Sequence, residues 1–180
     1  MNDMVKSKAR LCSDPLLSER YIAEIQKALP RPETTIYPYE PVIVDGMTAY
    51  LAGQIGKQDG GLAHVGVVGQ ELSVSEGASS ARICAQQALS WLSASTGGLA
   101  NLRRVLRMTC YVAHADGFDQ ISEVANGASD YLIETLGERG AHSRSVIGVK
   151  SLPRNAPVLV ELTAALRNRL PSVDLVTLKQ

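Results

Sequence analysis

The sequence has few aromatic side chains: they make up 4% of its 180 residues, with one Trp and one Phe. A hydrophobic core must therefore come from Val, Ile, Leu and Ala, which let helices pack close to a sheet but bury little area each. The composition, 45% hydrophobic and 20% charged, is ordinary for a globular domain. Because the core side chains are small, we expect part of the stability to come from contacts between subunits.

The sequence also has no net charge, because 18 Lys and Arg residues balance 18 Asp and Glu residues. It therefore lacks the electrostatic field that gathers nucleic acid or an anionic membrane surface. Arg103, Arg104 and Arg107 form one small basic cluster, but Tyr111 alone does not supply the aromatic rings that stack bases. We interpret the cluster as a solvated strand end, and the composition weighs against a nucleic-acid partner.

The sequence has only three cysteines, and their spacing matches no common paired motif. Cys12, Cys84 and Cys110 form no C-x-x-C pair and have no zinc spacing, so no metal site is expected. Their odd number, and an N-terminal stretch that carries an acid and lacks an apolar core, favour a reducing cytoplasm. No apolar run approaches the length of a membrane span, so no membrane association is expected.

An N-terminal arm is predicted to precede the main domain. Asp14 followed by Pro15 is a typical helix start, and apolar residues then recur at a spacing of four, which predicts a helix at about residues 15–29. A Pro-rich connector follows and should run extended. The expected organisation is an arm at 1–40, a domain at 41–168 and a tail at 169–180.

Two long helices are predicted inside the main domain. Ser73 and Glu76 form a capping box that opens the first, and Gly97-Gly98 closes it. Asp116 is expected to cap the second, which Gly137 ends. Asp45-Gly46 predicts a type I′ hairpin turn. Strands are expected at about 42–44, 47–55, 64–68, 102–112, 144–149 and 158–166.

These elements predict an α+β fold. Two long helices lie on one face of a mixed, mostly antiparallel sheet, which makes a two-layer sandwich, and the N-terminal helix is added to it.

Arg144 is the first candidate for function, because it begins an apolar strand that we expect to be buried. A guanidinium there needs either a protein carboxylate or an anionic ligand, and its planar fork fits a carboxylate with two parallel hydrogen bonds. Glu161 lies in the middle of another apolar strand and is one possible ion-pair partner. Gly53 marks either a ligand approach or a β-bulge, and Tyr39 either lines a pocket or packs the connector on the surface.

Three segments resemble the RidA/YjgF family, whose fold is that of the chorismate mutase-like trimers. They are Ala52-Gly53-Gln54-Ile55, the segment from Arg144-Ser145-Val146 to Leu152-Pro153, and Val160-Glu161-Leu162-Thr163-Ala164. The resemblance runs from about Leu16 to Leu166. The segment 126–130 and His142 are similar to a branch of the family with a longer N-terminal arm.

The resemblance implies a homotrimer with sites between subunits, in which small enamine or imine carboxylates are hydrolysed to 2-keto acids and ammonia. No metal or organic cofactor is implied. Arg144 would clamp the substrate carboxylate, Glu161 is the candidate acid, and the other substrate-binding candidates are Tyr39, Ala52, Gly53 and Val146.

Two departures from the family leave the activity open. Ala52 replaces a Ser, and Leu159 replaces the Glu that holds the attacking water, which Glu161 could replace only if its strand slips or bulges. The alternative is a non-catalytic trimer that binds a small carboxylate as a sensor or accessory protein. An endoribonuclease role, often attached to the family, is disfavoured by the zero net charge.

Overall fold

The computed structural model describes residues 15–33 and 36–170. The helices are α2 (Pro15–Ala28), α3 (Val74–Ser95) and α4 (Ile121–Leu136). The strands are β1 (Val42–Asp45), β2 (Thr48–Ile55), β3 (Lys57–Gln58), β4 (Gly61–Leu62), β5 (Leu102–Ala113), β6 (Ser143–Val149) and β7 (Val158–Leu166). Short 3-10 turns lie at Leu99–Asn101, Gly137–Gly140 and Pro153–Asn155.

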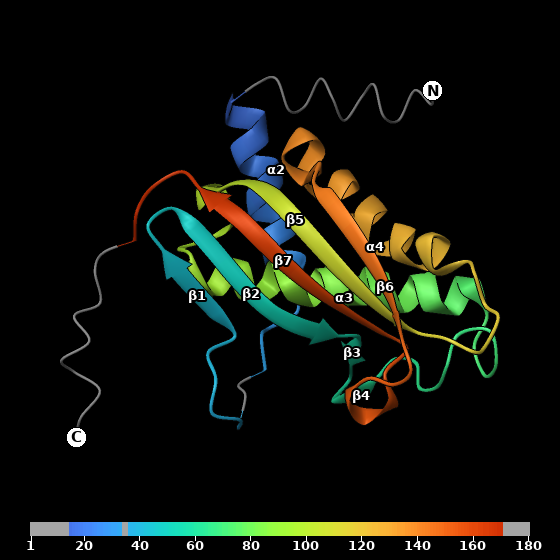
Figure 1. The fold of residues 1–180 in the computed structure, drawn as a ribbon. Helices are drawn as coiled ribbons and strands as arrows, with labels where there is room; N and C mark the ends of the chain where they lie inside the picture. The colour runs from blue at the N-terminus through green and yellow to red at the C-terminus, as the bar shows by residue number, and fades with distance from the viewer. Residues whose placement is uncertain (1–14, 34–35, 171–180) are drawn as a thin grey trace.

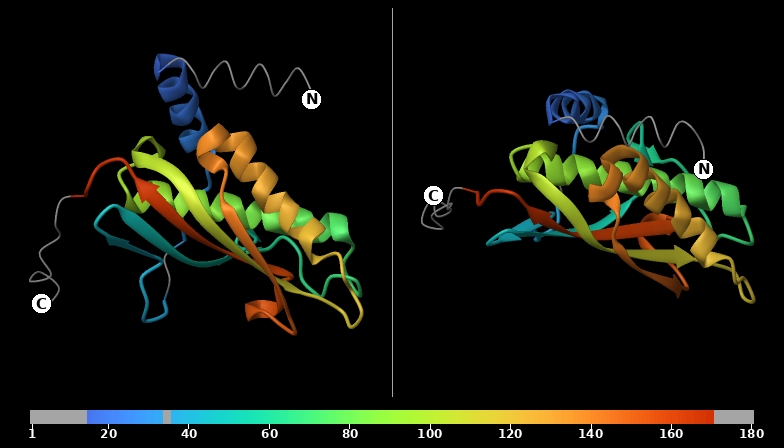
Figure 2. Two further views of the ribbon diagram at one scale, coloured as in Figure 1. Left: turned by 45° about the horizontal axis from the view of Figure 1, so that its top comes forward. Right: turned by 90° about the horizontal axis from the view of Figure 1, so that it is seen from above.

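The fold is an α+β two-layer sandwich, as predicted. Five strands form one sheet in the order β1-β2-β7-β5-β6, in which β5 and β6 are parallel and the other pairs antiparallel. The long helices α3 and α4 cover one face of this sheet and leave the other face without a helical cover (Figures 1 and 2). The edges of the sheet are β6 on one side and β1 on the other, and the end of β2 that β1 does not pair also lies at the edge.

The core lies between the helices and the sheet, and small aliphatic residues fill it. Along β7, every second residue from Val158 to Leu166 is buried, which matches the alternation of the sequence. The facing side of α3 presents Ala81, Ala85 and Ala88, all fully buried. The largest fully buried side chains among the described residues are Leu, Met and Val, so this core has no aromatic centre.

The N-terminal helix forms where the sequence predicts it and docks on the domain. Ile22 is buried, and Gln26 Oε1 accepts a hydrogen bond of 2.9 Å from the backbone N–H of Leu99. The hydroxyl of Tyr21 donates to the backbone oxygen of Glu134 at the end of α4. The division into arm, domain and tail stays a prediction, and most of the tail lies outside the described residues.

The helix starts were predicted with unequal success. The capping box at Ser73 and Glu76 is present, with both reciprocal hydrogen bonds. Asp116 does not cap α4, which begins at Ile121 after Gln120. The chain instead turns at Asp116 and Gly117, where the φ of Gly117 is 75°, so the helix starts four residues later than the sequence suggested.

Three predictions about the strands were wrong in detail. The hairpin forms, but its loop is Gly46–Met47 closed by the pair Asp45 and Thr48, with positive φ at Gly46 only. That is the pattern of a type II′ loop. Residues 64–68 form no strand, because Gly66 takes a φ of 124° and Val68 makes only isolated bridges.

Strand β6 was expected to be buried, but it is a half-exposed edge strand. It pairs with β5 alone, and Ile147 is 42% exposed. Ile147 therefore contributes little to the core of a single chain, whereas Val146 packs partly against that core.

We expect Gly127→Ala to destabilise the protein by about 1–3 kcal/mol. A methyl group there would lie 1.9 Å from the backbone oxygen of Ala78 in α3, so the two helices would have to separate. Helix propensity alone would favour Ala by about 1 kcal/mol.

Urea unfolding measures this difference, with Ser122→Ala at an exposed position of α4 as the control. A gain in stability for Gly127→Ala would show that the helices do not approach this closely.

Candidate functional site

The predicted site residues lie at two opposite edges of the sheet. Arg144 and Val146 are on β6, and Ala52 and Gly53 are on the free part of β2. The order β2-β7-β5-β6 separates these groups by three strand spacings, or about 14 Å. Within one chain the two groups do not meet.

The Arg144 guanidinium is held by two neutral oxygens of α4. Its Nη1 donates to Asn126 Oδ1 at 2.9 Å and to Ser129 Oγ at 3.1 Å. In the described residues no carboxylate pairs with it, so the ion pair with Glu161 that the sequence left open does not form. Its exposed side chain keeps the donors of Nη2 and Nε for another partner.

His142 extends this cluster along β6. Its Nδ1 lies 2.6 Å from the backbone oxygen of Gly140, and its Nε2 lies 3.2 Å from Ser129 Oγ. A carbonyl oxygen can only accept, so Nδ1 carries the hydrogen, and Nε2 of the neutral ring accepts from the Ser129 hydroxyl. The resulting chain of hydrogen bonds runs from Arg144 through Ser129 to His142.

No functional role was predicted from the sequence for Asn126, Ser129 or His142, although two spacings carry a signal. Asn126 and Ser129 are three residues apart on a helix and so share one face. His142 directly precedes β6 and is two residues from Arg144, a spacing that in extended backbone puts two side chains on one face. What the spacing alone does not reveal is that these two faces meet.

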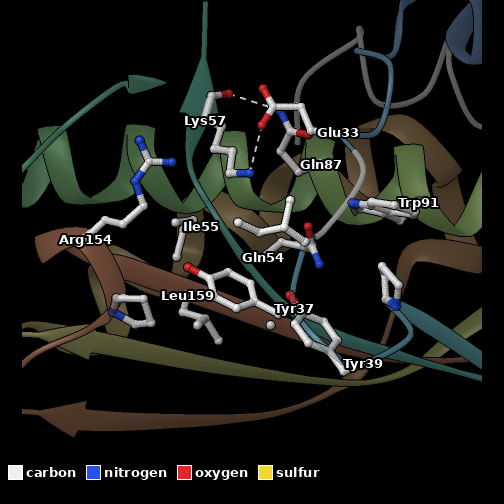
Figure 3. Close-up of a pocket in the computed structure, with 14 residues that line it drawn as sticks. Glu33, Tyr37, Tyr39, Gln54, Ile55, Lys57, Gln87, Trp91, Arg154 and Leu159 are labelled. Carbon is white, nitrogen blue, oxygen red and sulfur yellow. Dashed lines mark hydrogen bonds and ion pairs between the residues drawn. The ribbon is translucent and has the colours of Figure 1, made fainter. Parts of the chain in front are cut away.

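A cavity of about 530 Å³ lies at the β2 edge (Figure 3). Two tyrosines of the connector, Tyr37 and Tyr39, border it with nearly parallel rings whose centroids are 6.4 Å apart. Trp91 of α3 and Leu159 of β7 also line it. The walls thus combine aromatic and aliphatic side chains with amide and charged ones, and such a mixture is found in small-molecule sites.

The charged groups of this cavity are unequally paired. Lys57 Nζ lies 2.8 Å from Glu33 Oε2, so these two charges neutralise each other. Arg154 lines the mouth and makes no ion pair within the described part of the chain. It has a φ of 60° in the turn after Pro153, a left-handed conformation that is unusual for an Arg.

Gly53 lies at a β-bulge, which is one of the two alternatives left open by the sequence, and its approach to a ligand stays a prediction. The pairing of β2 with β7 shifts between Leu51 and Gln54, so a β-bulge is present. A Cβ atom at position 53 would lie 2.3 Å from Leu159 Cδ2, so the missing side chain makes room for that leucine. Leu159 therefore occupies the space against Gly53.

Glu161 lies on the open face of the sheet, away from this cavity. Its Oε2 accepts a hydrogen bond of 3.2 Å from the Tyr111 hydroxyl, and a second hollow of about 260 Å³ includes Glu161 and Arg107. Partial burial and the Glu161 carboxylate raise the pKa of Tyr111. The bulge is in β2, so β7 does not bring Glu161 to the place of Leu159, and its catalytic role stays a prediction.

The cysteines of the core contribute no reactive thiol. Cys84 and Cys110 are fully buried, and burial raises the pKa of Cys110 to about 12 and that of Cys84 well above its usual value. Cys12 lies outside the described residues. No cluster of three His, Cys, Asp or Glu that could hold a metal ion occurs in residues 15–33 or 36–170.

The sequence also matches a model of a known protein family. The model, described as "YjgF/chorismate_mutase-like, putative endoribonuclease", matches residues 19–166. The chain belongs to this family. Its membership supports a role in binding or processing a small molecule.

Individual relatives agree with this assignment. Protein TCP17 of Trypanosoma cruzi is 36% identical over 155 residues, which cover 84% of this chain and 97% of the relative. A crystal structure of a protein of unknown function from Agrobacterium tumefaciens is 30% identical with a TM-score of 0.75, and covers 83% of this chain and 94% of its own. A crystal structure from Shewanella oneidensis, described as "a putative endoribonuclease", is 28% identical with a TM-score of 0.77, and the match covers 83% of this chain and 99% of that one.

Among the described residues, none of the helices combines the length and apolar character that a bilayer span requires.

We expect Cys84 and Cys110 to resist thiol reagents in the folded protein. With a pKa of about 12, only about one Cys110 thiol in ten thousand is ionised at pH 8. The test uses Cys12→Ser protein and a chromogenic disulfide reagent, first in buffer and then in urea. Both thiols should react only after unfolding, and rapid reaction of the folded protein would contradict their burial.

Proposed function

We propose that this protein binds a small enamine or imine carboxylate between two copies of the chain and hydrolyses it to a 2-keto acid and ammonia. The observation that carries this proposal is Arg144, an exposed guanidinium held by neutral oxygens instead of an acid. A cation oriented in this way is suited to a carboxylate ligand, which can form two parallel hydrogen bonds with it.

The position of Arg144 supports a site shared between copies, and a homotrimer is the assembly we propose. One copy would supply the β6 edge with Arg144 and Val146, and its neighbour the β2 edge with Ala52, Gly53 and Tyr39. The open sheet face also exposes large apolar side chains that a neighbour would cover. These are Ile43 at 53%, Tyr50 at 51% and Ile147 at 42% exposure. Exposed apolar patches on a sheet commonly mark protein interfaces.

The cavity beside Gly53 would take the substrate side chain. Its volume of about 530 Å³ is within the range of small-molecule sites and larger than a three-carbon acid requires. The stacked tyrosines and Trp91 offer aromatic and aliphatic contact. We therefore favour a substrate with a sizeable apolar side chain attached to the carboxylate end.

Hydrolysis of an imine requires few catalytic groups from the protein. An iminium carbon is already electrophilic, so the site must hold the carboxylate, place a water and move protons. The need for proton transfer also favours the alternative of a binding protein without catalysis. Leu159 fills the space at Gly53, where the family's active members carry a water-holding carboxylate.

Arg144→Ala should abolish both binding and hydrolysis. The assay generates 2-aminoacrylate, and then bulkier imino acids, with a pyridoxal-phosphate lyase or an amino-acid oxidase and follows keto-acid release. Loss of a bidentate charged contact should reduce keto-acid affinity at least about 100-fold. Arg103→Ala, an exposed arginine on β5, is the control and should behave as wild type.

Keto-acid binding can be followed by fluorescence, because Trp91 is the one tryptophan of the sequence and lines the cavity. Saturable binding without accelerated hydrolysis would select the non-catalytic alternative. Retained binding by Arg144→Ala would remove Arg144 from the site.

Mixing two inactive variants should restore activity if each site takes one edge from each copy. Arg144→Ala disables the β6 edge, and Gly53→Leu blocks the β2 edge against Leu159. In random mixed oligomers about a quarter of the interfaces combine two intact edges. We expect about that fraction of wild-type activity after co-refolding. No recovery, in mixtures whose oligomers native mass spectrometry shows to be mixed, would contradict a shared site.

A further inference from the structure

We infer that Ser129 and His142 form a proton relay that activates the attacking water beside Arg144, an inference that rests on the proposed hydrolysis. The relay deepens that function by naming the base. In the family's active members a Glu at the position of Leu159 holds the attacking water. The relay would take over the proton transfer in this chain, which has no carboxylate at that position.

The hydrogen bonds of His142 fix its role. Because its Nδ1–H donates to the Gly140 carbonyl at 2.6 Å, the Nε2 lone pair is directed at Ser129 Oγ, 3.2 Å away. An imidazole oriented by a second acceptor is the arrangement of a general base. Both side chains are partly exposed, so a ligand at the β6 edge can reach them.

Ser129 has one hydrogen-bonding position left for water. Its O–H donates to His142 Nε2, and one lone pair accepts from Arg144 Nη1 at 3.1 Å. A hydroxyl oxygen has two lone pairs, so the second can accept a hydrogen from a water molecule. That water would lie beside the carboxylate end of the substrate, next to the carbon that carries the imine.

The placement of Ser129 depends on the close packing of α4. Gly127 lies against the Ala78 carbonyl, where no larger residue fits, and this contact fixes how closely α4 packs on α3. Asn126 and Ser129 then share the helix face that meets Arg144. Both residues contact the guanidinium, but only Ser129 continues to a basic nitrogen.

The reaction balances without a further reagent. The water oxygen bonds to the iminium carbon while its proton moves to Ser129 and the Ser129 proton moves to His142. The C=N double bond becomes a C–N single bond. His142 then returns the proton through Ser129 to the amino group, and the C–N bond breaks as the carbonyl forms. The remaining hydroxyl proton passes through Ser129 and His142 to the departing ammonia, which leaves as ammonium. Iminium acid and water give keto acid and ammonium.

Other groups near Arg144 are poorly suited to this role. The Glu161 carboxylate is on the opposite face of the sheet, bonded to Tyr111. Cys110 lies beneath Arg144 in the core and has no exposed surface. Within the described residues around Arg144, His142 is the side chain with both a basic atom and a hydrogen-bonded route to the ligand.

The experiment compares four variants of the full-length protein in the imino-acid hydrolysis assay and in keto-acid binding followed by Trp91 fluorescence. His142→Gln keeps a hydrogen-bonding group but cannot carry the proton, and Ser129→Ala breaks the relay. Ser129→Thr keeps the hydroxyl and should retain activity. Asn126→Ala is the matched control, because it removes the other contact of Arg144 and leaves the relay.

The relay predicts that His142→Gln and Ser129→Ala lose about 100-fold or more in the hydrolysis rate at saturation. The keto-acid Kd of His142→Gln should stay within about threefold of wild type, because both contacts of Arg144 with α4 remain, whereas Ser129→Ala should weaken the Kd about as much as Asn126→Ala does. Asn126→Ala should show the reverse, a weaker Kd with a near-normal saturated rate. In an additional variant, His142→Ala, added imidazole should restore part of the hydrolysis rate.

Three results would overturn the relay, and they differ from one another. Near-normal rates in both relay variants would reject it and leave the proposed hydrolysis standing. A loss of rate and affinity together in the relay variants and in Asn126→Ala alike would show that all three only position Arg144. A wild-type protein that binds keto acid but does not accelerate hydrolysis would reject both the relay and the proposed function.

Discussion

The neutral clamp on Arg144 is the interaction on which the site depends. Two uncharged oxygens of α4 orient the guanidinium without cancelling its charge. A carboxylate in their place would compensate the cation, and an incoming anion would then have to compete with it. Because the clamp comes from α4, the site depends in turn on how tightly that helix packs on α3 and on the sheet. The glycine contact at Ala78 thus connects core packing to ligand binding.

Much of the fold followed from local chemistry that one sequence contains. The alternation of β7, the capping box of α3 and the glycine end of α4 are all encoded within a few residues, and all are present. The errors came where distant contacts override local preference. Asp116 is a good cap residue, yet the turn at Gly117 delays the helix. The apolar composition of β6 suggested burial, but topology puts this strand at an edge.

The site was only half predictable for a similar reason. Arg144 could be selected because a charge on an apolar strand demands a partner. The partners themselves lie on another element, 15 and 18 residues earlier, and no local pattern identifies them. The residues beside Gly53 are likewise assembled by a bulge, which the glycine suggested and the register shift confirms. That the two groups occupy opposite edges depends on strand order, which a linear pattern does not specify.

The parallel strand β6 also has a consequence for how the protein can diverge. It joins the sheet through β5 alone, and its clamp residues sit on the crossover helix that leads to it. Changes on the ligand-facing side of this crossover would therefore leave the pairing of the other four strands intact. The cavity at the β2 edge is a separate module, built by the connector and α3. Recognition of the ligand carboxylate and preference for the ligand side chain can therefore evolve independently, since each depends on residues at a different edge of the sheet.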